Sequence, residues 1–193
     1  MRQKLASLLR ILPAILLPPV LLLSGDPLQI LPTLAALALH ECGHLAAFSL
    51  LGEPEPSLCF SLGGFRFVAK RPLSLKAEAL ICAAGPFANL AAGLLLLLLS
   101  LQGGGAQEYL VFSAALQFSS GAWNLLPIAD LDGARIICCL LARLAPAAAE
   151  CAARAISLAA LFLGLTVSLG VLYFSGAAFY TSLAFFLLLL ATP

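Results

Sequence analysis

Charged side chains are scarce in this sequence: Asp, Glu, Lys and Arg together make up only 10% of the 193 residues. A soluble domain carries about 25% charged residues, so this chain cannot cover a water-facing surface. Hydrophobic residues make up 62%, and the mean hydropathy is +1.07. We therefore expect an integral membrane protein. The net charge of +1 provides no basic surface for nucleic acid, which we do not expect as a partner.

Cysteine pairs with the spacing of a zinc ribbon or a redox motif are also absent. None of the six cysteines forms a C-x-x-C pair, which argues against a zinc ribbon or a redox motif. Most of them lie within or beside apolar runs, as is typical of small buried side chains. A hydrophilic block large enough for a soluble domain is missing too. We therefore expect one transmembrane domain over residues 1–193.

Long apolar runs predict an all-α polytopic membrane protein of about six spans, since a helix needs about 20 apolar residues to cross hydrocarbon. The runs cover residues 5–23, 28–51, 79–101, 109–127, 155–174 and 177–192. The last two form one stretch that we divide near Ser175 and Gly176 into a helical hairpin. Arg2 and Lys4 give a basic start, but no A-x-A-like cleavage site follows, so we expect a retained first span.

The basic residues predict the orientation of these spans. With the N-terminus in the cytosol, the cytosolic pieces are the N-terminal tip, 52–78, 128–154 and the C-terminus. Together with the cytosolic start of the first run, which contains Arg10, these pieces hold all ten Lys and Arg residues, whereas the opposite side has only Asp26 and Glu108. Because positive charge accumulates on the cytosolic side, we expect both termini to be cytosolic.

Two cytosolic segments are more than simple connections. In LCFSLGGFRFVA, at 58–69, apolar and aromatic residues surround a Gly63-Gly64 pair, which predicts a small membrane-associated β-hairpin. The segment ARIICCLLARLA, at 134–145, is too short to span. It predicts an interfacial helix whose two arginines reach the lipid headgroups.

The second span carries the strongest chemical signal, HECGH. His40 and His44 are four residues apart and therefore share one face of a helix, where both imidazoles can reach one metal ion. Glu41 lies close enough to exchange protons with a water at that ion. These are the only two histidines, and random placement would put them four apart in roughly one chain in a hundred. The structural alternative is a histidine pair bonded across helices, with Glu41 as its partner.

A zinc site needs a third protein ligand, and no third histidine exists. Asp132 is the strongest candidate because its segment follows a span that runs in the same direction as the HECGH span. Asp130 is the rival ligand, and Cys42 is weaker because it points away from the face shared by the histidines. Ligand type favours Zn²⁺, one per chain, over iron or cobalt.

These motifs resemble those of the site-2 protease family of intramembrane metallopeptidases. HECGH is followed two spans later by NLLPIADLDG, at 124–133, and AGPFANL at 84–90 resembles the family's G-P-x-x-N stretch. The six-span layout is similar to the stage IV sporulation protein FB branch, so a sporulation role is an expectation by analogy. The motifs lie within about residues 28–135, and we expect neither a PDZ-like insertion nor a CBS-like domain.

The resemblance implies an intramembrane zinc endopeptidase that cuts membrane-embedded or membrane-tethered proteins in regulated intramembrane proteolysis. It implies a metal site of His40, His44 and Asp132, with Glu41 as the catalytic acid and base. It also implies that Asn124 positions the substrate or steadies its carbonyl oxygen. The expected location is the cell membrane, with the active site toward the cytosol. A regulatory membrane protein and the oligomeric state stay open.

Two other functions fit the same residues. One is a zinc or proton transporter that uses the intramembrane histidines and carboxylates, although we find no internal repeat of the kind many transporters carry. The other is an inactive relative that only binds membrane helices. The intact Glu41 argues against it, because a pure binder has no need of that acid.

Overall fold

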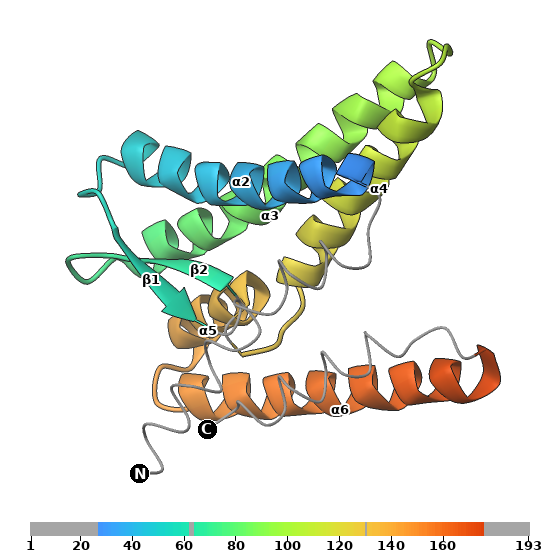
Figure 1. The fold of residues 1–193 in the computed structure, drawn as a ribbon. Coiled ribbons are helices and arrows are strands. Elements are labelled where there is room, and N and C mark those ends of the chain that lie inside the picture. The colour runs from blue at the N-terminus through green and yellow to red at the C-terminus, as the bar shows by residue number, and fades with distance from the viewer. Residues whose placement is uncertain (1–26, 62–63, 130, 176–193) are drawn as a thin grey trace.

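A computed structural model describes residues 27–61, 64–129 and 131–175. Within these ranges the fold is mostly helical, with one two-stranded sheet (Figure 1). Its elements are α2 (Pro27–Leu50), β1 (Ser57–Ser61), β2 (Gly64–Val68), α3 (Leu75–Ser100), α4 (Gln107–Asn124), α5 (Asp132–Leu144) and α6 (Ala149–Ser175). The expected spans 5–23 and 177–192 lie outside the described residues.

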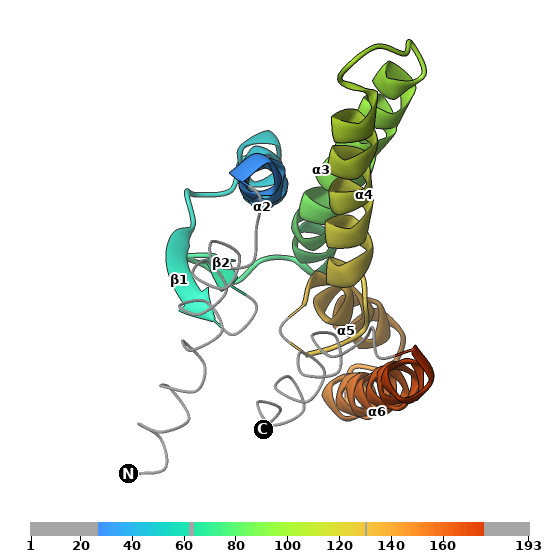
Figure 2. The same cartoon turned by 45° about the vertical axis from the view of Figure 1, so that its right-hand side comes forward.

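Helix α3 is the centre of the arrangement and packs against α2, α4 and α5. It runs beside α4, while α6 lies at the α5 end of the molecule (Figures 1 and 2). Ser74 caps the N-terminus of α3, since its hydroxyl accepts a hydrogen bond from the Ala77 amide at 3.2 Å. Small residues let the helices approach closely: a Cβ at Gly43 of α2 would lie 2.6 Å from the Ala84 carbonyl oxygen of α3.

Three described helices are long and apolar enough to cross a membrane: Ile30–Leu50, Leu75–Ser100 and Ala149–Val171. The fourth expected span, 109–127, corresponds to α4, which does not meet that standard. Its 18 residues give a length of about 27 Å, slightly below the hydrocarbon thickness of about 30 Å. It also places polar side chains in the interior, where Ser113 and Gln117 are buried.

The segment expected to form a hairpin contains the two strands, which pair antiparallel from Ser57 with Val68 to Ser61 with Gly64. Gly63, in the expected turn, lies outside the described residues. Beyond the strands, an ion pair of 2.8 Å joins Arg71 to Glu53 and closes the base of the hairpin. The membrane association of this hairpin stays a prediction.

The hairpin is attached to the helices by a small apolar cluster. Phe67 of β2 packs on a buried group formed by Phe48 and Ile81, from α2 and α3. Phe48 lies one turn beyond His44, so the cluster borders the part of α2 that carries HECGH. The hairpin is therefore held beside the candidate metal centre.

The expected interfacial helix is present as α5, and its 13 residues give about 20 Å, too short to span. The expectation that both arginines reach the headgroups is wrong for Arg135, whose guanidinium binds Glu78 of α3 at 2.8 Å. A partly buried guanidinium is stabilised by a nearby carboxylate, and the pair fixes α5 to α3. Arg143, near the end of α5, is exposed.

Candidate metal centre

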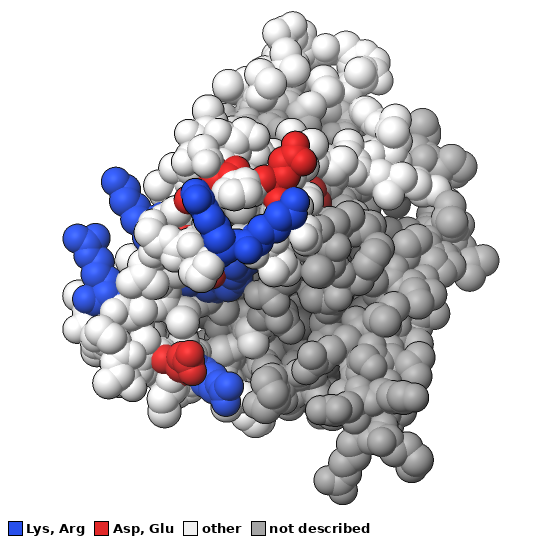
Figure 3. All heavy atoms as spheres, turned by 90° about the vertical axis from the view of Figure 1, so that its left-hand side faces the viewer, with Lys and Arg blue, Asp and Glu red and all other residues white. Residues whose placement is uncertain are grey.

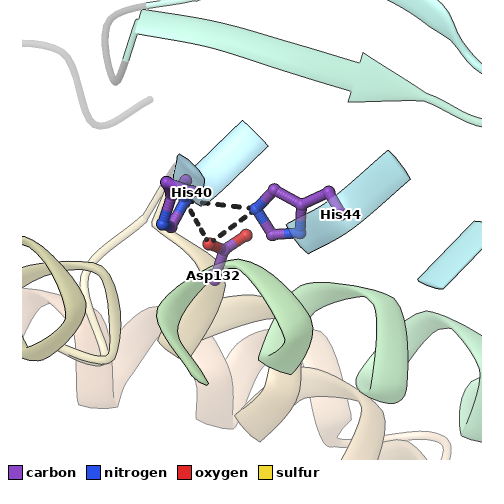
Figure 4. A group of neighbouring side chains, drawn as sticks. All are labelled: His40, His44 and Asp132. Carbon is purple, nitrogen blue, oxygen red and sulfur yellow. Dashed lines mark hydrogen bonds and ion pairs between the residues drawn. The ribbon is translucent and has the colours of Figure 1, made fainter. Parts of the chain in front are cut away.

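Three side chains from two helices meet in one buried place (Figure 4). The Nε2 atoms of His40 and His44 are 3.1 Å apart. Asp132 Oδ2 lies 3.1 Å from the first of these nitrogens and 3.2 Å from the second. Both imidazoles come from α2, whereas Asp132 is the first residue of α5. These residues could hold a metal ion.

The geometry suits a four-coordinate cation. In a tetrahedral zinc site with bonds of about 2.0–2.2 Å, neighbouring ligand atoms lie about 3.3–3.6 Å apart. The three edges of the triangle in this chain are 3.1, 3.1 and 3.2 Å. Two imidazoles and a carboxylate are a donor set used by catalytic zinc sites, which keep a fourth position open.

The outer nitrogen of each histidine fixes which ring nitrogen carries the proton. His44 Nδ1 lies 2.7 Å from the carbonyl oxygen of Ile81, which can only accept, so this nitrogen is the donor. His40 Nδ1 lies 3.0 Å from Asn89 Oδ1, which likewise accepts. In the neutral imidazoles both Nε2 atoms therefore present lone pairs to each other and to the Asp132 carboxylate. Three converging acceptors repel one another unless a cation lies among them.

The Glu41 carboxylate is a second feature that fits a bound cation and a polar ligand. Its Oε2 atom is buried, and among the described residues it has no hydrogen-bond partner. A buried carboxylate oxygen without a partner is costly, and such atoms in native structures call for an explanation. Glu41 follows His40 directly on α2. The residues present therefore fit a divalent cation together with a polar molecule that this carboxylate contacts.

Gly85 of α3 provides the space that both imidazoles occupy. A Cβ at this position would lie 2.6 Å from His44 Cε1 and 2.9 Å from His40 Cε1, and closer still to His44 Nε2. The next residue, Pro86, lacks an amide hydrogen and interrupts the hydrogen-bond ladder of α3. The helical hydrogen bond that Pro86 cannot make is the one to the Cys82 carbonyl, next to Ile81, whose own carbonyl holds His44.

The position of Asp132 depends on a close backbone contact. A Cβ on the next residue, Gly133, would overlap the Leu125 carbonyl and lie 2.5 Å from the Leu126 carbonyl oxygen. Only glycine therefore lets α5 begin against this connection. The preceding residues are held by α6, where the Ser157 hydroxyl accepts a hydrogen bond from the Ala129 amide at 2.6 Å.

The electrostatics of α5 favour an ionised Asp132 carboxylate and a neutral Cys139 thiol. Burial raises the pKa of Asp132, but hydrogen bonds from His40 and His44, which form when a ring without a bound cation carries a proton on Nε2, outweigh burial and hold that pKa below its ordinary value. Burial raises the pKa of the Cys139 thiol to about 11, so it is protonated at neutral pH. Asp132 is thus in the form that binds metal, and Cys139 is not.

The structure brings together three of the five site residues expected from the sequence, His40, His44 and Asp132, and Glu41 follows His40 directly on α2. Asn124, the fifth, lies at the end of α4, where its Nδ2 donates to the Ser120 carbonyl at 3.0 Å. Its catalytic role stays a prediction.

The structure describes one of the two rival ligands, Cys42, but not the other, Asp130. Cys42 is exposed and is not part of the described ligand group, in agreement with the face assigned to it. Asp130 lies outside the described residues.

Sequence reasoning missed several residues around the ligands. Asn89 enters the sequence analysis only as part of the 84–90 stretch, without a role of its own, although it binds His40 directly. Gln117 was not singled out at all, and it binds Asn89 at 2.6 Å. An amide in the middle of an apolar span was the available signal, since polar groups at membrane depth are costly and mark functional positions.

No protein-family model matches this sequence, and no curated protein matches it. Among solved structures, the site-2 protease from Methanocaldococcus jannaschii is similar, with a TM-score of 0.63 and 19% sequence identity. The match covers 94% of this chain and 84% of that one. At this identity the likeness establishes the fold: the chain has the fold of a site-2 protease.

Proposed function

We propose that this chain is an intramembrane zinc metalloendopeptidase that hydrolyses peptide bonds of membrane-embedded or membrane-tethered proteins. The observation that carries the proposal is the convergence of two lone-pair nitrogens and one carboxylate beside the partnerless oxygen of Glu41. A fold shared with a solved site-2 protease supports it. A role in regulated intramembrane proteolysis belongs to the same proposal.

His40, His44 and Asp132 would hold one Zn²⁺. When bound, zinc polarises a carbonyl and lowers the pKa of water to about 7. Glu41 Oε2, buried and without a described partner, would accept a proton from the attacking water and later return it to the leaving amine. Asn124 uses one amide hydrogen on the Ser120 carbonyl, and its other hydrogen would donate to the substrate carbonyl oxygen.

The substrate must be extended where it is cut, because a helix shields its own carbonyls in hydrogen bonds. We propose that the hairpin β1–β2 receives such a segment by strand addition, since a two-stranded sheet has unpaired edges. Phe67 packs this sheet against the helices beside the candidate metal centre, and the Arg71–Glu53 pair closes its base.

We place the protein in the cell membrane as a multi-pass protein with its active site toward the cytosol. Charged side chains gather on the face that Figure 3 shows, whereas the described surface toward the α3–α4 connection is uncharged in that view. The described basic residues outside the apolar helices include Lys70, Arg71 and Arg143, all exposed. Such a distribution is expected at the cytosolic surface of a membrane protein.

The Glu41→Gln substitution tests this function. The purified chain is reconstituted in liposomes with a panel of single-span segments, each fused to a fluorescent protein. We expect the variant to bind zinc as the wild type does but to cleave no segment, because the amide cannot accept the proton. Cys42→Ala, at the next and exposed position of α2, is the matched control and should cleave normally. Undiminished cleavage by Glu41→Gln would remove the assignment, and zinc flux without cleavage would favour a transporter.

A further inference from the structure

Gln117 is a buried amide in the middle of α4 that the proposed mechanism does not use. Its exposed fraction is only 5%, and its Oε1 accepts a hydrogen bond from Asn89 Nδ2 at 2.6 Å. Placing a polar side chain inside an apolar span costs free energy unless its groups are hydrogen-bonded. A leucine there would pack equally well against neighbouring helices, so the amide needs a reason beyond packing.

The bond from Gln117 determines which way the Asn89 amide faces. Asn89 is completely buried on α3, and its Nδ2 donates both to Gln117 and to the Ala36 carbonyl at 2.9 Å. Both of these partners are acceptors, so the nitrogen must face them. If the amide were turned over, its oxygen would meet two other oxygens and both hydrogen bonds would be lost.

The orientation of Asn89 in turn determines the proton position on His40. Asn89 Oδ1 lies 3.0 Å from His40 Nδ1 and accepts, so the ring proton lies on Nδ1 and the lone pair on Nε2. An amide turned over would offer its nitrogen to Nδ1 and place the proton on Nε2. That proton would point at Asp132 Oδ2 and His44 Nε2, where the metal is expected.

We propose that Gln117 is a positioning residue of the metal centre, acting through Asn89 to keep the His40 Nε2 lone pair available to the metal. This inference rests on the proposed function, because it takes His40 as a ligand. It links three helices in series: α4 holds α3, and α3 holds the ligand on α2. Partners of this kind change metal affinity by about 10- to 100-fold when removed.

Gln117→Met tests the inference, because it removes the acceptor oxygen while keeping an unbranched side chain of similar length. The full chain is purified in lipid nanodiscs, and Zn²⁺ is titrated against a chelator. We expect zinc affinity to fall about tenfold, the low end for such partners, since Gln117 acts one bond further from the ligand. Gln117→Glu keeps an acceptor for Asn89 and should restore most of the affinity.

Ser113→Ala is the matched control, because Ser113 is also buried and lies one turn earlier on α4. Its hydroxyl donates to the Tyr109 carbonyl of its own helix, so the variant loses a buried hydrogen bond without touching Asn89. Thermal unfolding of each variant is measured in parallel. A purely structural role for Gln117 would lower the unfolding temperature and leave zinc affinity unchanged, as in the control.

The outcomes separate this inference from the proposed function. Loss of zinc affinity in Gln117→Met, recovered in Gln117→Glu and absent in Ser113→Ala, supports it. If the wild-type chain binds zinc and the Gln117→Met variant binds it with the same affinity, the inference fails and the proposed function stands. A wild-type chain that binds no zinc overturns both. If Gln117→Met does not fold, Gln117→Asn, one methylene too short to reach Asn89, decides the question by the same measurement.

Discussion

The contact between Gly85 and the two imidazoles leads to a sharp prediction for Gly85→Ala. The added methyl would lie 2.6 Å from His44 Cε1 and 2.9 Å from His40 Cε1. Carbon atoms pack at about 3.5–4.0 Å, so the rings or α3 must move by at least roughly 0.6–0.9 Å. A metal site tolerates displacements of only about 0.5 Å. Overpacking of this kind costs about 1–3 kcal/mol, which corresponds to about a 5- to 150-fold loss of zinc affinity.

The assay is zinc content and chelator competition on the purified chain, beside Gly170→Ala. A Cβ at Gly170 of α6 would meet nothing within 4 Å, so this control adds the same methyl to another long apolar helix without a clash. We expect it to bind zinc as the wild type does. If Gly85→Ala also bound zinc with unchanged affinity, the closeness of α3 to the imidazoles would not limit the metal site, and the reasoning would be refuted.

Two further predictions concern the placement of Asp132. Gly133→Ala should destabilise the fold by about 3 kcal/mol or more and lower the zinc content. The reason is that its Cβ would overlap the backbone carbonyls of Leu125 and Leu126, which cannot rotate aside. An unchanged unfolding temperature would contradict this. In a double-mutant cycle of Glu78→Gln and Arg135→Gln, measured by denaturant unfolding, we expect a coupling of about 1 kcal/mol, and a coupling near zero would show that the pair does not hold α5.

The two histidines of the candidate metal site could be predicted from the sequence because helical spacing determines their relative position locally. His40 and His44 share a face of any helix that contains both, whatever the rest of the fold. Predicting Asp132 required a further argument, namely that the span before it runs in the same direction as the HECGH span. The structure places Asp132 beside the histidines, as that argument expects. The same reasoning placed Cys42 on the opposite side of α2, where it is exposed.

The supporting residues could not be predicted in the same way. Spans rich in leucine show little periodicity, so the sequence does not reveal which face of α3 meets α2. The proximity of Gly85 to the imidazoles depends on that choice, and so does the hydrogen bond from Asn89 to Gln117. The sequence alone assigns Arg135 to the lipid headgroups, because an arginine at a membrane interface can pair with a headgroup or with a carboxylate of the protein. The packing of α5 against α3 is what brings Glu78 within reach.

These supporting contacts share one face of α3, although α3 supplies no ligand. Glu78 pairs with the arginine one turn beyond Asp132, Ile81 holds His44, Gly85 faces both imidazoles and Asn89 holds His40. Their spacing of three or four residues places them in line along the helix. Rotation of α3 by one residue, about 100°, would therefore remove all four contacts together. The geometry of the candidate metal centre thus depends on the register of α3, which gives a structural reason for a G-P-x-x-N stretch beside it that supplies none of the three candidate ligands.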